Sequence, residues 1–373
     1  MTDRRSVLPK QKKWAVTAYI AGDNNLSDAG LEDIEEMCQV GASGNAWVGV
    51  EIDTCGEHTG SIRYEITDPD AWGKAHRTVI ERLPEKDSGD PETLRSFVAW
   101  GLQRFPAKNR LLVVWNHGSG FRTVRRDIGY DDFGSSLDMP EVENALRRGG
   151  IGTKNRIAIL GFDACLMNML EVVHHFRGVA RYVVGSQQTE PGDGWPYDKV
   201  LAAANGGPSA RALAESIVKA YLADYESKGV FDVTQSAIDL SRTDTVVRRL
   251  HDLGNALADH FEACKDAVKT VRTSLQVFEM ADYVDMVHMA ESLAASVPEP
   301  SVGKAAAKLA TATRKAVVAN GTLGASVADA HGLSVWFPPD DDTYLRYRAK
   351  YLRLRCNAGS APGWVRFLDR YYG

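Results

Sequence analysis

Short apolar runs alternate along the first 240 residues with longer segments whose apolar residues recur at helical spacing. The apolar runs predict strands at 14–20, 46–53, 111–115, 156–162, 181–186 and 233–240. The helical spacing predicts helices at 28–41, 91–104, 166–177 and 209–226. Residues 111–115 and 156–162 are almost wholly apolar, which is typical of strands buried on both faces of a parallel sheet. This order of elements predicts a doubly wound α/β sheet with helices on both faces.

The remainder of the chain has a different pattern. From 242 to 320 the apolar spacing is mostly helical, and the tail at 361–372 predicts a short amphipathic helix. A late apolar run, at about 333–337, predicts a strand that returns to the same sheet. We therefore expect one elaborated unit, with a core over residues 1–241 and a helical region over residues 242–373.

Composition narrows the class of protein. The chain has 373 residues, of which 44% are hydrophobic and 25% charged, as in ordinary globular proteins. Its 44 Lys and Arg against 49 Asp and Glu give a net charge of −5, which argues against a nucleic-acid partner held by phosphate contacts. No apolar run approaches the roughly 20 residues of a membrane span. Neither nucleic acid nor a membrane is expected as a partner.

The N-terminus and the cysteines bear on the compartment. The first residues are basic, but the apolar run that follows resembles a strand and lacks a signal-peptidase site, so no signal peptide is predicted. The five cysteines are widely spaced and include no C-x-x-C pair, which argues against a disulfide framework or a zinc site. We expect a cytoplasmic protein, and the sequence leaves secretion open as the alternative.

Chemically reactive residues follow the two most apolar strands. Residues 111–115 run into Asn116-His117-Gly118, and residues 156–162 run into Asp163-Ala164-Cys165. Ligands bind at the carboxyl ends of parallel strands, so both loops should open onto one edge of the sheet. A thiol just ahead of a helix feels the positive end of the helix dipole, which lowers the thiol pKa.

A neighbouring imidazole can take the thiol proton and later protonate a leaving amine. The glycines after His117 permit a tight loop whose N–H groups face a developing oxyanion. The pattern therefore predicts a His117/Cys165 pair for nucleophilic catalysis. It leaves open the alternatives of a structural histidine and of a cysteine that serves as a small buried hydrophobe.

At these residues the chain resembles the clostripain family, the C11 cysteine peptidases of the caspase-like clan. The matching segments run from the first strand to the last: AYIAGDNNL (18–26), WNHGSG (115–120), GFDACLMNMLEV (161–172), PGDGWPY (191–197), SAIDLS (236–241) and GLSVWFP (332–338). The resemblance implies a caspase-like, mostly parallel central sheet sandwiched by helices, with a helical C-terminal elaboration.

The resemblance also implies roles for individual residues. His117 would be the general base and acid, and Cys165 the nucleophile that forms an acyl-enzyme. The backbone amides of Gly118 and Cys165 would form the oxyanion hole. Asp163 would lie in the S1 pocket and favour Arg or Lys at P1, since a carboxylate pairs with a guanidinium or ammonium group. Trp195 is expected either to form an apolar wall of the substrate cleft or to be a core residue.

Two further expectations come from the family. Members are often matured by self-cleavage after a basic residue between His and Cys, for which Arg125 and Arg126 are the preferred candidates; the alternative is a solvated charged loop. No cofactor is expected to be required and no metal site is predicted, but calcium is left open because it is known in parts of the family. The oxygen-rich candidates lack EF-hand spacing; they are Asp23, Asn24, Asn25, Asp28, Asp131, Asp132 and Asp138.

The sequence thus favours a cysteine endopeptidase that cleaves protein or peptide substrates after Arg or Lys and is restrained by latency or by a regulator or inhibitor. The alternative from another class is a catalytically quiet caspase-like module that binds partners. Serine hydrolases of the G-x-S-x-G type, dinucleotide-binding and P-loop proteins and H-E-x-x-H zinc peptidases are disfavoured, because their motifs are absent.

Overall fold

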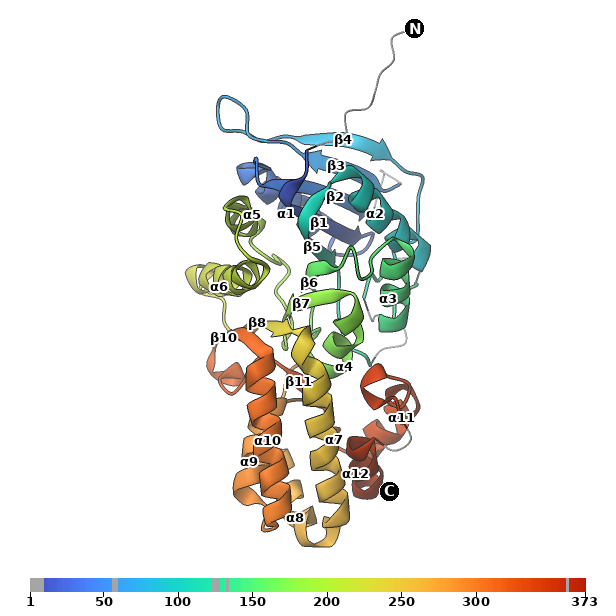
Figure 1. Ribbon diagram of the computed structural model, residues 1–373, viewed down its shortest axis with the longest axis vertical. Helices are drawn as coiled ribbons and strands as arrows, with labels where there is room; N and C mark the ends of the chain where they lie inside the picture. The colour runs from blue at the N-terminus through green and yellow to red at the C-terminus, as the bar shows by residue number, and fades with distance from the viewer. Residues whose placement is uncertain (1–9, 56–59, 123–127, 132–133, 360–361) are drawn as a thin grey trace.

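The computed structural model describes residues 10–55, 60–122, 128–131, 134–359 and 362–373. Within these residues, nine strands form one sheet in the order β10-β8-β7-β6-β5-β1-β2-β3-β4 (Figure 1). Strands β2, β1, β5, β6 and β7 are parallel, and the outer strands are antiparallel. The strands are β1 (Lys12–Gly22), β2 (Ala46–Thr54), β3 (Ile62–Ile66), β4 (Arg77–Arg82), β5 (Ala107–Trp115), β6 (Ile157–Asp163), β7 (Ala180–Gly185), β8 (Val233–Asp239) and β10 (Val317–Leu323).

Helices cover both faces of the sheet, as predicted. Helices α1 (Ser27–Val40), α5 (Tyr197–Asn205) and α6 (Ala210–Lys228) lie on one face, and α2 (Pro91–Arg104), α3 (Met139–Arg148) and the short α4 (Leu170–Val173) lie on the other (Figure 1). Alternate residues of β1 point to opposite faces. Val16 therefore packs in the core under α1, α5 and α6, and Tyr19 packs in the core under α2 and α3.

The C-terminal region extends beyond the sheet as a group of helices (Figure 1). The helices are α7 (Thr243–Asp259), α8 (Phe261–Thr273), α9 (Met286–Ser296), α10 (Pro300–Ala316), α11 (Asp341–Tyr351) and α12 (Gly363–Tyr372). Their buried residues belong to the same continuous hydrophobic core as α2 and α3. None of the helices in the described ranges is long and apolar enough to cross a bilayer.

One strand of this region differs from the expectation. The late apolar run forms β11 (Ser334–Trp336), but β11 pairs with β9 (Tyr283–Asp285) in a separate two-stranded sheet and does not join the main one. The strand that returns to the main sheet is β10, which begins in the last residues of the segment predicted to be helical, and it pairs antiparallel to β8. The residues of β10 are mostly half-buried, so its sequence shows neither a strong alternation nor a continuous apolar run. The proposed boundary near residue 241 stays a prediction.

The helix predicted over 166–177 is also shorter than expected. A regular helix begins only at Leu170 and continues as a 3-10 turn over His174–Gly178. Leu166 has a positive φ of 65°, a conformation that interrupts a right-handed helix. The backbone N–H of Leu166 donates to the Gln188 carbonyl (3.1 Å) and that of Asn168 to the Ser186 carbonyl (2.9 Å). Tertiary hydrogen bonds thus replace the first helical turn after Cys165.

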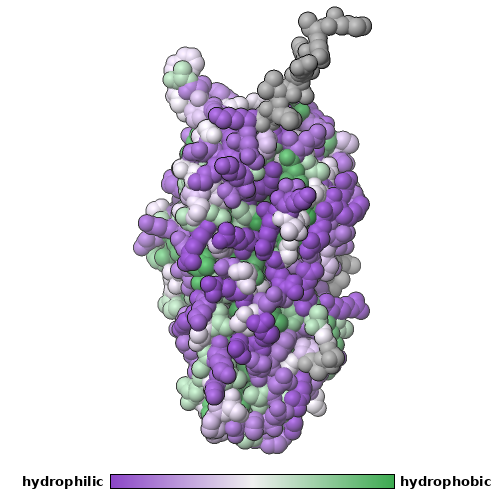
Figure 2. All heavy atoms as spheres, in the orientation of Figure 1, coloured by the Kyte–Doolittle hydropathy of each residue, from purple (hydrophilic) through white to green (hydrophobic). Residues whose placement is uncertain are grey.

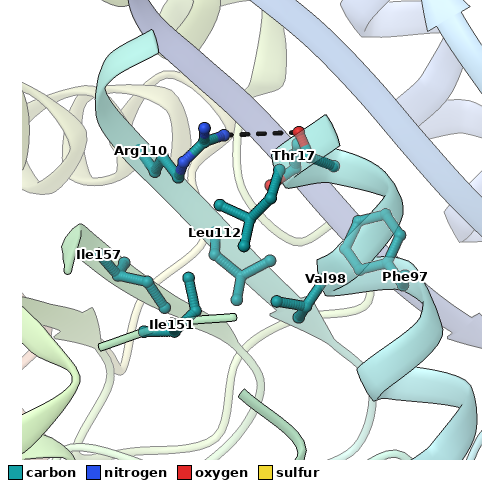
Figure 3. A pocket seen from close by; sticks show the side chains of 9 residues that line it. Thr17, Phe97, Val98, Arg110, Leu112, Ile151 and Ile157 are labelled. Carbon is teal, nitrogen blue, oxygen red and sulfur yellow. Dashed lines mark hydrogen bonds between the residues drawn. The ribbon is translucent and has the colours of Figure 1, made fainter. Parts of the chain in front are cut away.

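A small apolar cavity lies near the amino-terminal halves of β5 and β6 (Figure 3). Its volume is about 20 Å³, enough for one water molecule. Arg110 borders it and donates to the carbonyl of Phe105 (3.0 Å) at the C-terminal end of α2. The cavity is therefore a packing gap next to a helix cap, and a ligand site must lie elsewhere.

Candidate active site

The loops after β5 and β6 meet at the carboxyl edge of the sheet. The two strands are parallel neighbours, with Trp115 opposite Asp163, and the Asn116 N–H donates to the Asp163 carbonyl (3.2 Å). A cavity of about 130 Å³ opens at this edge. It is lined by Leu26, Trp115, Asn116, His117, Asp163, Ala164, Cys165, Glu190, Pro191, Gly192 and Gly194. The structure thus brings His117 together with Asp163 and Cys165, which follow a different strand and lie more than 40 residues later in the sequence.

Gly118 lies directly against the backbone of Cys165. A Cβ at position 118 would be 2.4 Å from the Cys165 carbonyl oxygen and 3.0 Å from its nitrogen, which no side chain could tolerate. The backbone N–H groups of Glu190, Cys165 and Gly118 point at the Cys165 sulfur, with Glu190 N 3.3 Å from Sγ. Several N–H donors that converge at one point stabilise a negative charge there.

The electrostatics of Cys165 differ from the expectation. Burial raises the pKa of the Cys165 thiol above its ordinary value, and the surrounding backbone N–H groups oppose this only in part. The expected lowering by a helix dipole is wrong, because the helix begins five residues later, at Leu170. The resting thiol is therefore protonated at neutral pH and needs a base to become nucleophilic.

His117 contacts a residue that the sequence analysis did not connect with it. Its Nε2 lies 2.8 Å from Oδ1 of Asn25, which belongs to the loop between β1 and α1. From the sequence, Asn25 is a candidate only for calcium. The available signal was topological: β1 is the parallel neighbour of β5, so the loop after β1 opens at the same edge.

Two carboxyl groups, the buried Asp163 and the half-buried Glu190, form one wall of the cavity. Asp163 Oδ2 accepts from the Tyr197 hydroxyl (2.8 Å) and from the Trp195 N–H (3.1 Å). Burial raises the pKa of Asp163 to about 6. Burial and the adjacent Asp163 charge raise the pKa of Glu190 well above its usual range. The side chains of Asp163 and Glu190 are also hydrogen-bonded to each other, so the two carboxyl groups share a proton in the empty cavity.

Trp195 is a core residue and not a wall of the cleft. Its side chain is completely buried, and its indole packs on Gly161 of β6, where a Cβ would come within 2.8 Å of the ring. Residues 190–194 reach the cavity as expected, but Gly194, with a positive φ of 59°, reverses the chain and directs the indole under the sheet.

The remaining candidates contribute no visible site. Arg125, Arg126 and Asp132 lie outside the described residues. Asn24 stabilises its own turn by accepting from the Leu26 N–H (2.9 Å), and Asp138 caps α3. In the described part of the chain, no group of three or more His, Cys, Asp or Glu side chains is placed to hold a metal ion. Calcium stays untested.

Comparison with known proteins agrees with this geometry. A family model described as the clostripain family matches residues 18–370. Clostripain of Hathewaya histolytica is 28% identical over 225 residues, which are 52% of this chain and 42% of that protein. The match therefore spans less than half the length of that relative.

Two solved structures share the fold. A secreted C11 cysteine protease from Bacteroides thetaiotaomicron, in complex with an irreversible peptide inhibitor, superposes with a TM-score of 0.71 at 20% identity over 91% of this chain and 98% of the other. An inactive zymogen C11 protease from Parabacteroides distasonis gives 0.74 at 18% identity over 94% and 98%. These likenesses confirm the expected caspase-like architecture.

Proposed function

The chain belongs to the clostripain family of C11 peptidases, and from this premise we propose that it is a cysteine endopeptidase that cleaves after Arg or Lys. One observation carries the proposal: a single cavity holds His117 and Cys165 beside a wall formed by the buried Asp163 and the half-buried Glu190. A thiol beside an imidazole supplies the nucleophile and its base. An acidic wall suits a cationic side chain.

The reaction follows from these groups. His117 takes the proton from Cys165, and the sulfur attacks the carbonyl carbon of the scissile peptide bond. The resulting oxyanion is turned toward the N–H groups of Gly118 and Cys165. His117 then returns the proton to the leaving amine, and the acyl group stays on the sulfur. Water, deprotonated by His117, hydrolyses this thioester and regenerates the thiol.

The P1 preference rests on Asp163 and Glu190. At neutral pH Asp163, with a pKa of about 6, is mostly ionised, whereas Glu190, whose pKa is raised well above its usual range, retains a proton that a guanidinium or ammonium group would displace. The P1 cation then lies against ionised carboxylates from which water is excluded. A neutral or acidic P1 side chain would leave those groups buried and unpaired, which is costly.

Self-processing is proposed as part of the same function. The Parabacteroides relative is described as an inactive zymogen. In this chain, Arg125 and Arg126 lie in the sequence between His117 and Cys165 and provide the basic P1 residue that such a step needs. Intact-mass analysis after incubation tests the step: cleavage after either arginine is expected, and its loss in Cys165→Ala would identify it as self-cleavage.

The proposed activity is tested with fluorogenic peptides that end in Arg, Lys, Asp or Leu. We expect turnover of the Arg and Lys peptides only. Cys165→Ala should abolish turnover, and Cys38→Ala, at a half-buried thiol on α1, should leave it unchanged. Asp163→Asn should reduce the preference for basic residues without preventing alkylation of Cys165. Turnover that survives Cys165→Ala would exclude the assigned nucleophile, and no turnover of any peptide would favour the quiet binding module.

We also propose a cytoplasmic location and control by a regulator or inhibitor. All five cysteines are free thiols, which suits a reducing compartment. The Bacteroides relative, by contrast, is described as secreted. Fractionation of the native host cell tests the proposal: recovery of the protein outside the cytoplasm would overturn it.

A further inference from the structure

We propose that Asn25 is a positioning residue for His117: its side-chain carbonyl accepts the Nε2 proton and so presents Nδ1 of the imidazole as the base for Cys165. The inference rests on the proposed function, because it assigns how that base is oriented. The observation behind it is the 2.8 Å contact between Asn25 Oδ1 and His117 Nε2.

The loop that carries Asn25 is held in place from several sides. The adjacent Asn24 is buried, and its amide donates to the carbonyls of Ala21 (3.0 Å) and Tyr130 (2.9 Å). Gly22 packs so closely on β2 that a Cβ would come within 2.8 Å of the Asp53 carbonyl oxygen. The buried neighbours therefore fix the backbone, and exposed Asn25 projects from a rigid turn at the rim of the cavity. A side chain on such a turn orients its partner at little entropic cost.

The chemistry explains why the acceptor has to be on Nε2. A neutral imidazole has one N–H and one lone pair, and the hydrogen bond at one nitrogen decides which nitrogen carries the proton. An acceptor at Nε2 places the proton there and the lone pair on Nδ1. When Nδ1 takes the thiol proton, the ring becomes an imidazolium, and the dipole of the Asn25 carbonyl stabilises the charge on its Nε2–H side.

A neutral acceptor also suits the protonation state of the site. Burial keeps the Cys165 thiol protonated at rest, so His117 has to be neutral to act as a base. A carboxylate in the place of Asn25 would favour the imidazolium form and occupy the base before the reaction. An amide orients the ring without holding it in the charged form.

The test compares Asn25→Ala and Asn25→Asp with the parent protein and with Asn155→Ala, an exposed asparagine in another loop. Three readouts are used: kcat and KM with an Arg peptide, the pH dependence of Cys165 alkylation by iodoacetamide, and the His117 tautomer and pKa from ¹⁵N NMR of the imidazole. The second and third do not require peptide turnover, so a failure of the proposed function would be distinguishable from a failure of this inference.

Asn25→Ala should lower kcat about tenfold with KM little changed, and the His117 tautomer should become a mixture, because water replaces the fixed acceptor only in part. Asn25→Asp keeps an acceptor at the same point but adds a charge, and it should raise the His117 pKa by about one unit or more. Asn155→Ala should change nothing. The inference is overturned if Asn25→Ala leaves both kcat and the tautomer unchanged, or if Asn25→Asp leaves the His117 pKa unchanged.

Discussion

The sheet edge and the C-terminal region contribute different things to the site. The sheet edge supplies the reactive groups: His117, Cys165 and Asp163 all follow parallel strands. The C-terminal region contributes none of them, yet its segment 279–285 contacts the loops on both sides of the cavity. The hydroxyl of Tyr283 donates to the Ser119 carbonyl (2.6 Å) in the loop that also carries His117 and Gly118.

The opposite loop is held by the same segment. Gln187 donates to the buried carboxylate of Asp285 (3.0 Å), and the Gln188 side chain accepts from the Glu279 N–H (2.9 Å). Gln188 in turn precedes Glu190, whose N–H points at the Cys165 sulfur. The reactive residues are therefore encoded locally, at strand ends, whereas their relative position depends on a segment around β9 that lies more than 100 residues after Cys165 in the chain.

The sharpest test of this division changes the sheet edge alone. Gly118→Ala should reduce kcat/KM by about a hundredfold or more, because the new methyl group would collide with the Cys165 carbonyl and displace the amides that face the oxyanion. Peptide kinetics measures the loss, and Gly152→Ala, at a glycine with open space around it, is the matched control. A Gly118→Ala protein with near-normal activity would show that this close approach has no role in the reaction.

The second prediction concerns the acidic wall and pH. A P1 cation binds best when Asp163 and Glu190 are ionised, and both have raised pKa values, that of Asp163 about 6. Affinity for an Arg peptide should therefore rise with pH, with KM falling up to about tenfold per unit between roughly pH 5 and 7. Steady-state kinetics over this range measures the slope.

The matched variant for that slope is Asp163→Asn, which removes one titrating group from the wall. Its KM should be higher and should vary less with pH than that of the parent. A KM that is independent of pH in the parent would contradict the assignment of the wall to P1 recognition.

The contact between the C-terminal region and the His117 loop can be tested separately from the sheet edge. Tyr283→Phe removes the hydroxyl that holds Ser119, which should cost about 1 kcal/mol of unfolding free energy and lower kcat a few-fold. Tyr344→Phe removes a hydroxyl that donates to Asp369 (2.5 Å) within the C-terminal region. It should cost a similar amount of stability and leave kcat unchanged. Denaturant unfolding and peptide kinetics separate the two; equal losses of kcat would show that the effect of Tyr283 is only one of general stability.

The same division explains what the sequence could predict. The positions of β1, β2, β5, β6, β7 and β8 and the meeting of His117 with Cys165 follow from local patterns, because parallel neighbours end at one edge whatever else the chain does. The half-buried or exposed strands β3, β4 and β10 give no such pattern, so the sequence does not predict them. The helix start after Cys165 could not be predicted, because carbonyls of residues 186 and 188 compete for its backbone N–H groups. Tertiary hydrogen bonds of this kind override the local helix propensity.

Two other features of the site depend on distant partners in the same way. The apolar ring of Trp195 suits a cleft wall and a core equally well, and only the missing side chain at Gly161, on a strand 34 residues earlier, decides for the core. The contact between Asn25 and His117 joins loops that lie 92 residues apart. A pattern within one segment contains no information about either partner.

The smallest expected effect is on the pH dependence of the unfolding free energy, through the contact between His331 and Asp285. His331 Nδ1 lies 3.1 Å from Asp285 Oδ1, and this hydrogen bond raises the pKa of His331 above its ordinary value of 6.5, against the opposing effect of burial. A base with a raised folded-state pKa stabilises the protein fully below its unfolded pKa, and the stabilisation is lost as pH rises through the folded value.

The variant His331→Asn removes this titrating group and can still donate a hydrogen bond to Asp285. The parent should thus be more stable than the variant by less than about 1 kcal/mol near pH 5.5, since the imidazole is partly exposed, and the difference should shrink by about pH 8. Comparing parent and variant in denaturant unfolding isolates this group from His174, whose pKa burial lowers to about 4 and whose contribution runs in the opposite direction. A stability difference that grows with pH would mean that Asp285 does not hold a protonated His331.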